Sequence, residues 1–383
     1  MRVLVDLRTT QGRHVSADGG SEYARSVVRR IAELDRRDRF VALVEHGLGD
    51  SDVASEARTR GIEVVVARSD AEIVRYSAEL ELTAAYCPLP YGLQAKPGKL
   101  PTIVTIHGLR PIELPTDSQE WRYTNLIRLP IVFAKGALRN HYVRRRMQEF
   151  RALINLTDLI VAPSEHTKAA LCALFPGAVD KLTPVLYSPR TAVTQSETPD
   201  AQLLAEIDLE DSAYVLLVSG GRYEKNILRA LSAIRMLRNE GSWPGLRVVI
   251  TGGVPRFTPP ALLEGVSVLP YVNRQCLGAL YCFARALIYP TLNEGFGYPP
   301  VEAMRFGTPV AAAGVCSLPE IYGDAISYFD PRNEHDIAAK IWRVLHHPPS
   351  QQVTRKKADA ILSRQDADLD KLINLLCDDR LFD

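Results

Sequence analysis

The stretch at residues 289–314 combines glycines, carboxylates and the start of a helix in a pattern suited to binding a ligand. An apolar run of strand type, 284–289, leads into it, and Pro299 and Pro300 indicate where a helix begins. Proline suits a first helical turn because its missing N–H would have no intrahelical partner there. The loop and helix residues that could bind a ligand are Glu294, Gly295, Phe296, Gly297 and Glu302.

These residue types divide into binders of phosphate and binders of hydroxyl groups. Backbone N–H groups of the loop and the dipole of the following helix favour an anion, and the glycines let it approach the backbone closely. The carboxylates of Glu294 and Glu302 instead accept hydrogen bonds from hydroxyl groups. Together they favour a sugar nucleotide. Taken singly, Glu302 as a stabiliser of a helix N-terminus and Glu294 as a solvated loop residue are equally good interpretations.

A second glycine loop, at residues 219–226, follows the apolar run 214–218 and precedes a helical pattern. A pyrophosphate carries two or more negative charges, which Arg222 and Lys225 would offset. Either cation alone would be interpreted as solvated. Both in one glycine loop at the entrance to a helix favour phosphate binding.

The N-terminus repeats the order of strand, glycine loop and helix. Gly19 and Gly20 lie between an apolar run at residues 2–7 and apolar residues at helical spacing. This order opens a doubly wound α/β domain, in which ligands bind at the carboxyl ends of the strands. The glycine spacing is not G-x-G-x-x-G, so no nicotinamide site is expected, and a plain strand-to-helix turn is the alternative. His107 follows the strand predicted at 102–106, where a side chain could take part in chemistry.

Residues 294–310, E-G-F-G-Y-P-P-V-E-A-M-R-F-G-T-P-V, resemble the Glu-x7-Glu signature of the family 4 retaining glycosyltransferases, which have the GT-B fold. The resemblance runs on to residue 331 and covers the N-terminal half more loosely. It implies an α/β chain with two Rossmann-like, doubly wound domains facing a central cleft. It also implies transfer of a hexose, with retention, from a nucleoside diphosphate sugar to a glycan or lipid-linked acceptor, with neither metal nor other cofactor.

The resemblance also implies roles for the two loops of the C-terminal half. Glu302 would hold the ribose hydroxyls, and Glu294 would hold hydroxyls of the donor sugar and help position the anomeric carbon. Arg222 and Lys225 match the family's G-R-x-x-K-N form and would bind the diphosphate together with the amides of residues 295–297.

In the N-terminal half, Gly19 and Gly20 match the family's loop near the donor phosphates and the acceptor. His107 matches a histidine near the transferred sugar, with Gly108 in place of the usual aspartate, which counts against an acid/base role for position 108. Residues 19–26, G-G-S-E-Y-A-R-S, look similar to bacterial mannosyl- and rhamnosyltransferases of surface polysaccharides such as O-antigen and lipopolysaccharide. This favours a GDP-linked over a UDP-linked donor.

Residues 121–155 are predicted to be mostly helical and are unusually basic, with apolar residues interleaved. A basic amphipathic helix binds an anionic membrane surface, and the alternative is the solvated face of an ordinary helix. Candidates for contact with a membrane or an acceptor are Arg139, Arg144, Arg145 and Arg146.

Other features mainly exclude functions. Asp50-Ser51-Asp52 forms a D-x-D, as in metal-dependent glycosyltransferases of the other major fold, but a helix N-cap is the favoured interpretation. Six cysteines lack the C-x2-C spacing of metal sites and are predicted to be free thiols. A net charge of +1 gives no reason to expect nucleic acid as a partner. Because no signal peptide or membrane-spanning segment is recognised, a cytoplasmic location is expected, with the inner face of the cell membrane as a variant of it.

A length of 383 residues is enough for two domains. We predict an N-terminal, acceptor-binding domain at 1–190, a linker at 191–212 and a donor-binding domain at 213–357, with a final helix at 358–383 that returns to the first domain. Two rival functions remain open. One is a non-catalytic scaffold of a polysaccharide assembly complex that binds sugar nucleotides, and the other is a sugar-nucleotide epimerase or hydrolase.

Overall fold

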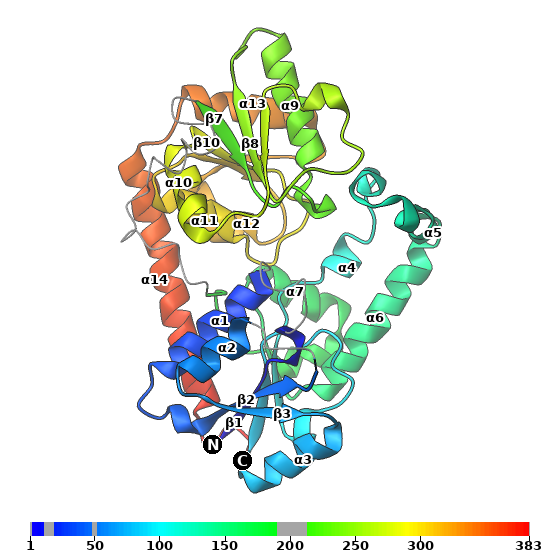
Figure 1. Cartoon of the computed structure of the whole chain (residues 1–383), viewed down its shortest axis with the longest axis vertical. Coiled ribbons are helices and arrows are strands. Elements are labelled where there is room, and N and C mark those ends of the chain that lie inside the picture. Colours follow the sequence, from blue (N-terminus) through cyan, green and yellow to red (C-terminus); the bar gives the residue numbers. More distant parts are fainter. Residues whose placement is uncertain (1, 11–18, 48–51, 190–212, 383) are drawn as a thin grey trace. The chain divides into compact units, whose positions relative to one another are not determined.

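The computed structural model describes residues 2–10, 19–47, 52–189 and 213–382 (Figure 1). The chain divides into two compact units. The first comprises Met1–Leu109, Arg145–Thr191 and Ser363–Asp383, and the second comprises Arg110–Arg144 and Ala192–Leu362.

The first unit is built on a sheet of six parallel strands in the order β3-β2-β1-β4-β5-β6. The strands are β1 (Val3–Asp6), β2 (Phe40–Glu45), β3 (Glu63–Ala67), β4 (Ala84–Cys87), β5 (Thr102–Thr105) and β6 (Leu159–Val161). Helices of this unit are α1 (Gly19–Ala32), α2 (Asp52–Thr59), α3 (Asp70–Glu79), α7 (Glu165–Leu174) and the ends of α6 (Arg139–Leu156) and α14 (Gln351–Leu376).

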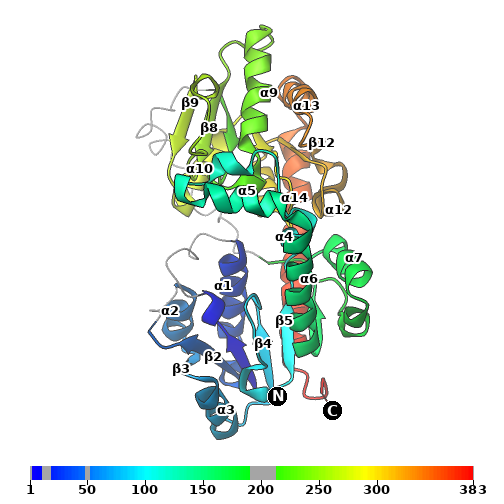
Figure 2. The ribbon, with the colours of Figure 1, turned by 90° about the vertical axis from the view of Figure 1, so that its right-hand side faces the viewer.

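Both faces of this sheet are covered, because successive side chains of a strand point to opposite faces. Val3 and Val5 of β1 pack with α1, α2 and α14 on one face, whereas Leu4 packs with Ile73 of α3 on the other. Figure 2 shows α1 beside the strands of this sheet.

The second unit repeats the design with the strand order β12-β11-β10-β7-β8-β9. Its strands are β7 (Tyr214–Leu217), β8 (Arg247–Thr251), β9 (Val266–Leu269), β10 (Ala286–Tyr289), β11 (Val310–Ala313) and β12 (Ser327–Phe329). Its helices include α4 (Arg110–Glu113), α5 (Leu129–Ala137), α9 (Ile227–Asn239), α10 (Arg274–Phe283), α11 (Tyr298–Arg305), α12 (Leu318–Tyr322) and α13 (Glu334–His346). Apolar residues of α9 and α13 form one core with alternate residues of β7 and β8.

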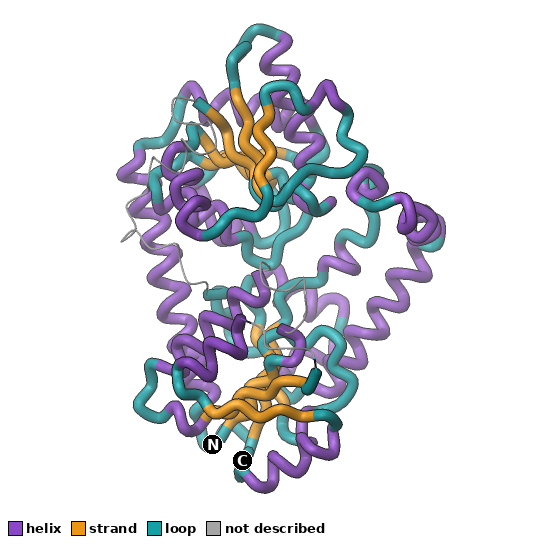
Figure 3. Tube along the Cα trace, viewed as in Figure 1, coloured by secondary structure: helices purple, strands orange, loops and turns teal. Residues whose placement is uncertain are grey.

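Both sheets therefore have the doubly wound order 3-2-1-4-5-6, and each is flanked by helices (Figure 3). The predicted class, two doubly wound α/β halves, is confirmed. In such sheets the order reverses between the first and fourth strands, and ligands bind beyond the carboxyl ends of these two strands. In the second unit these strands are β7 and β10, which lead into the glycine loops at 219–226 and 290–297.

Several boundaries differ from those expected. Residues 110–144 group with the second unit, although the sequence placed them in the first domain. A buried ion pair between Asp117 and Arg229 of α9, with atoms 3.3 Å apart, is one reason. The final helix begins at Gln351, before residue 358, and its part from Ser363 belongs to the first unit. The predicted linker lies outside the described residues.

Candidate active site

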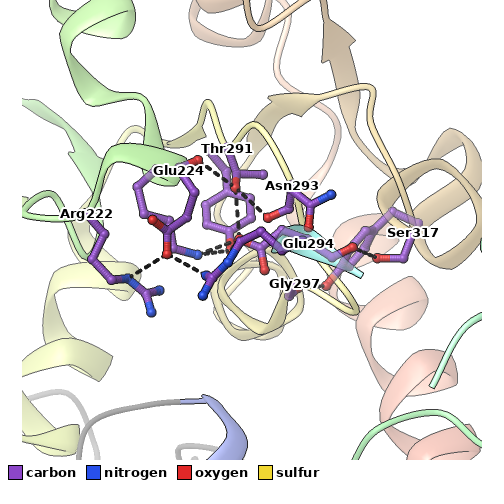
Figure 4. A network of polar contacts seen from close by, with 11 residues as sticks. Arg222, Glu224, Thr291, Asn293, Glu294, Gly297 and Ser317 are labelled. Atoms are coloured by element: carbon purple, nitrogen blue, oxygen red, sulfur yellow. Dashed lines mark hydrogen bonds and ion pairs between the residues drawn. The ribbon is translucent and has the colours of Figure 1, made fainter. Parts of the chain in front are cut away.

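Two loops of the second unit meet at the point where its strand order reverses (Figure 4). Asn226 joins them: its side-chain amide donates to the carbonyl oxygens of Pro290 at 2.9 Å and Pro331 at 2.7 Å. Asn226 is almost fully buried and has a φ of 55°, a left-handed conformation that asparagine tolerates better than most residues. The last residue of the G-R-x-x-K-N form thus fixes the position of one loop relative to the other.

The first loop packs closely against the backbone at the end of β8 and just after it. The N–H of Gly220 donates to the carbonyl oxygen of Thr251 at 2.9 Å. A Cβ on Gly220 would lie 2.4 Å from the carbonyl oxygen of Gly253 and 2.6 Å from Cγ2 of Ile250. Because no side chain fits there, this position requires glycine for close packing.

A buried ion pair connects the two loops. The Lys225 ammonium lies 2.5 Å from Oε1 of Glu294, and the two side chains are 7% and 15% exposed. The hydroxyl groups of Tyr289 and Thr291 donate to the same oxygen at 2.6 Å and 2.9 Å. Lys225 also donates to the Tyr289 hydroxyl at 2.9 Å. Two residues predicted to bind different parts of a donor are therefore each other's partners.

Burial and charge act in opposite directions on the pKa of Glu294. Burial alone would raise the pKa of this carboxyl, but the Lys225 ammonium, the hydrogen bonds from Lys225 and Tyr289, and the Arg222 guanidinium lower it below its ordinary value. Burial also lowers the pKa of Lys225, against the attraction of Glu294. Glu294 is thus ionised at neutral pH and serves as a hydrogen-bond acceptor rather than as an acid.

Arg222 has a different carboxylate beside it. Its Nε lies 3.5 Å from Oε1 of Glu224, which is buried, while the Arg222 side chain is 39% exposed. Burial alone would lower the pKa of Arg222, but the carboxylates of Glu224 and Glu294 raise it above its ordinary value. A second guanidinium, that of Arg110, contacts the same oxygen of Glu224 at 2.6 Å.

The second loop leads into α11, which begins at Tyr298, one residue before the predicted start. Gly297 has a φ of 85°, and a Cβ there would lie 2.5 Å from Leu318, so glycine is required. Phe296 is buried and its ring lies 5.4 Å from that of Tyr298. The phenyl ring therefore anchors the loop by packing, and any contact with a ligand would fall to the backbone.

Glu302 projects from α11 and is buried. The Tyr281 hydroxyl of α10 donates to its Oε2 at 3.0 Å. α10 and α11 therefore jointly determine the orientation of this carboxylate. The second unit thus holds Arg222, Lys225, Glu294, the loop at 295–297 and Glu302.

The first unit holds His107, Gly19 and Gly20. His107 follows β5, and its Nε2 lies 2.8 Å from the carbonyl oxygen of Pro88. Its ring makes an edge-on contact with Tyr23 of α1, with centroids 4.6 Å apart. Gly19 and Gly20 are the first residues of α1, so they belong to a helix rather than to a loop. The helix that they open is the one that carries the tyrosine beside His107.

The Tyr23 hydroxyl is itself fixed, since it lies 2.8 Å from that of Tyr86 and 3.0 Å from that of Thr105. Burial raises the pKa of Tyr23 to about 12, so it remains protonated. The hydroxyl therefore exchanges no proton at neutral pH, and the contact of Tyr23 with His107 is one of ring packing.

The four arginines proposed to contact a membrane or an acceptor all lie on α6. Arg139 and Arg144 are exposed. Arg145 and Arg146 both pair with Glu149, at 3.1 Å and 2.6 Å. Two of the four charges are therefore partly offset. Among the described residues, no helix is long and apolar enough to cross a bilayer.

Sequence reasoning missed several residues of this site. Glu224 lies in the glycine loop at 219–226, between Arg222 and Lys225 in the sequence. A carboxylate at that position could have been predicted to pair with one of the two cations. Tyr289 and Thr291 looked like strand and loop residues, and nothing in their spacing marks them as donors to Glu294. Arg110 lies 114 positions from its partner and had no signal at all.

Comparison with known proteins gives the family context. Residues 204–360 match the family described as Glycosyl transferases group 1. This region of the chain is similar to the group 1 glycosyltransferases. It includes both loops and Glu302, while Arg110 and His107 lie outside it.

Two of the proteins similar to this chain are, by their names, O-antigen chain mannosyltransferases. O-antigen chain mannosyltransferase B of Escherichia coli is 29% identical over 211 residues, which are 53% of this chain and 55% of that protein. O-antigen chain mannosyltransferase RfbU of Salmonella typhimurium strain LT2 is 38% identical over 73 residues, 19% of this chain and 21% of that protein. The aligned region thus spans about half of the first relative and about a fifth of the second.

The fold has relatives among solved structures. Alr3699/HepE of Anabaena, crystallised with UDP and glucose, covers 98% of this chain and 99% of its own, with a TM-score of 0.70 at 14% identity. At this identity the likeness concerns the fold. The fold is that of the GT-B glycosyltransferases, as the resemblance in the sequence implied.

Proposed function

We propose that this protein is a hexosyltransferase of surface polysaccharide synthesis. It moves a mannose-type hexose from a nucleoside diphosphate sugar, GDP-linked in preference to UDP-linked, to a glycan or lipid-linked acceptor. The observation that carries the proposal is the buried Lys225–Glu294 pair at the reversal point of the second sheet. The names of the two O-antigen mannosyltransferases support the sugar and the pathway class.

Glu294 is proposed to hold the donor sugar through its second oxygen. Among the described residues, the three side-chain donors to this carboxylate all go to Oε1. Oε2 is thus left to accept hydrogen bonds from sugar hydroxyls, and ionisation of the carboxylate strengthens them. Three donors on one oxygen also fix the carboxylate's rotation, so the sugar is bound in one orientation.

The leaving diphosphate would be stabilised where its charge grows. Arg222, 39% exposed, and the backbone amides of residues 295–297 are the proposed donors. Preorganised donors aimed at developing charge lower the barrier without reorganisation during the reaction. Retention at the anomeric carbon and independence from a metal are part of the proposal and rest on the Glu-x7-Glu resemblance.

Product analysis tests this function. The protein would be incubated with GDP-mannose or UDP-glucose and an octyl mannoside as surrogate acceptor, and the new anomeric proton followed by NMR. An α-linked product, absent with Glu294→Gln, is expected. Nucleotide binding without any product would favour the scaffold, and an altered sugar nucleotide formed without acceptor would favour an epimerase.

We also propose that the acceptor is reached at an anionic membrane surface. α5 has no buried residue although it is mostly apolar, and Ile127 just before it is 86% exposed. Residues 121–148 contain seven arginines and lysines and no aspartate or glutamate, and the flanking Glu120 and Glu149 pair with three of the seven, Lys135, Arg145 and Arg146. Such a surface suits anionic lipid headgroups. A second copy is a poorer occupant, because pairing two such surfaces would bring like charges together.

Flotation with vesicles tests this part separately. Binding to phosphatidylglycerol vesicles and not to phosphatidylcholine is expected. Ile131→Ser with Phe133→Ser should abolish it, since both side chains are more than 60% exposed, and Arg144→Gln with Arg145→Gln should weaken it. Val353→Ser, at an exposed position of α14, is the matched control. Equal flotation of all variants would refute this partner.

A further inference from the structure

A single carboxylate, that of Glu224, stands between two guanidinium groups. Its side chain is 7% exposed, and its Oε1 lies 2.6 Å from Nη1 of Arg110 and 3.5 Å from Nε of Arg222. Figure 4 shows Glu224 beside Arg222 in the polar network of the site. Lys225 in the same loop is already paired with Glu294.

The two arginines do not share Glu224 equally. Arg110 makes a short, charge-assisted hydrogen bond to it. Nε of Arg222 is buried and has no hydrogen-bond partner among the described residues, and 3.5 Å is too long for a strong bond. Arg110 therefore binds Oε1 of Glu224, the same oxygen that lies near Arg222.

The position of Arg110 is fixed by the segment that carries it. The Tyr223 hydroxyl donates to the carbonyl oxygen of Leu114 at 3.1 Å. Asn293, next to Glu294, donates to Glu113 at 2.8 Å. With the buried Asp117–Arg229 pair, these contacts hold the start of the 110–144 segment against both loops of the site.

This arrangement decides how much charge is available for a diphosphate. The five side chains joined by these ion pairs, Arg110, Arg222, Lys225, Glu224 and Glu294, carry three positive and two negative charges. Without Arg110 the positive and negative charges would be equal. A buried carboxylate left without its partner would then pair with the remaining guanidinium, because an unpaired buried charge is costly.

We propose that Arg110 is a positioning residue for donor binding. By engaging Glu224 it leaves the guanidinium of Arg222 free to bind the diphosphate. Arg110 acts through Glu224 and need not touch the donor. This inference rests on the proposed function, because it assumes that Arg222 binds a nucleoside diphosphate.

A double-mutant cycle with Glu224 tests it. Binding of GDP and UDP would be measured by calorimetry for the parent, Arg110→Ala, Glu224→Gln and the double variant. Arg110→Ala should weaken nucleotide binding about tenfold, because Arg222 would then pair with Glu224 and lose one charge-assisted hydrogen bond to the diphosphate. The double variant should bind nucleotide as tightly as the single variant Glu224→Gln, to within about twofold. The reason is that the uncharged amide of glutamine no longer competes with the diphosphate for Arg222.

Two further variants separate positioning from general damage. Arg110→Lys keeps a cation beside Glu224 and should retain most of the affinity. Arg235→Ala, an exposed arginine on α9, should change nothing.

Three results would overturn the inference. Unchanged affinity in Arg110→Ala would show that Glu224 does not compete for Arg222. A double variant as weak as Arg110→Ala would mean that Arg110 contacts the nucleotide itself. If neither nucleotide binds the parent protein, both the proposed function and this inference fail. If the parent binds a nucleotide but one of the first two results is found, only the inference about Arg110 is refuted.

Discussion

Removing only one member of the buried Lys225–Glu294 ion pair should lower the unfolding free energy substantially. Lys225→Met removes the ammonium but leaves Glu294 buried, with only the Tyr289 and Thr291 hydroxyls as side-chain donors. At 2.5 Å and an effective dielectric constant of about 20, the Coulomb attraction is about 7 kcal/mol, of which desolvation of the two groups cancels a large part. Leaving one partner unpaired should cost about 3–5 kcal/mol of unfolding free energy.

Urea unfolding followed by tryptophan fluorescence measures this cost where it arises. Trp121, Trp243 and Trp342 all lie in the second unit, so the signal reports that unit. The double variant Lys225→Met with Glu294→Gln should recover most of the loss, because it removes both charges. A loss below about 1 kcal/mol in Lys225→Met, or no recovery in the double variant, would refute the account of this pair.

The cost should depend on pH in a defined direction. The pKa of Glu294 is lowered in the folded state from an ordinary value of 4.5, so its contribution to stability is present above pH 4.5 and is lost as pH falls through the folded pKa. In Lys225→Met the ammonium is gone, and burial should raise this pKa. The difference between parent and variant should therefore be largest near pH 7 and shrink below about pH 5.

Three more outcomes follow from the site. Glu294→Gln should abolish hexose transfer in the NMR assay while nucleotide affinity, by calorimetry, stays within about threefold, because Glu294 is assigned to the sugar. Glu302→Gln should instead weaken nucleotide binding about tenfold, since it is assigned to the ribose; the opposite pattern would exchange the two roles. Gly220→Ala should destabilise the second unit by about 1–3 kcal/mol, because its Cβ would overlap backbone and side-chain atoms, whereas Gly245→Ala, with open space around it, should be neutral in the same urea assay.

Much of the fold could be predicted because its signals are local. The runs at 102–106 and 214–218 form the strands Thr102–Thr105 and Tyr214–Leu217, since a strand covered on both faces is a short, continuous apolar run. The two glycine loops were located for the same reason, as each lies between a strand and a helix.

The partners within the site could not be predicted in the same way. Arg222 and Lys225 were taken as two free cations for phosphate, yet each has a carboxylate beside it, and only tertiary contacts determine which one. Arg110 reaches Glu224 because residues 110–144 pack on the second unit, which no local pattern indicates. Similarly, helical spacing suggested an amphipathic basic helix, but could not indicate that α5 would have no buried face.

The most direct test of the central claim is nucleotide binding by the second unit. Unfolding of the parent and of Glu302→Gln would be followed by tryptophan fluorescence with UDP, GDP, ADP and dTDP, each alone and as a sugar conjugate. A ligand present at about 100 times its Kd and bound only to the folded state adds about 2.7 kcal/mol. We predict stabilisation by GDP and GDP-mannose that is reduced in Glu302→Gln. No stabilisation of the parent by any of these nucleotides would contradict a donor site in this unit.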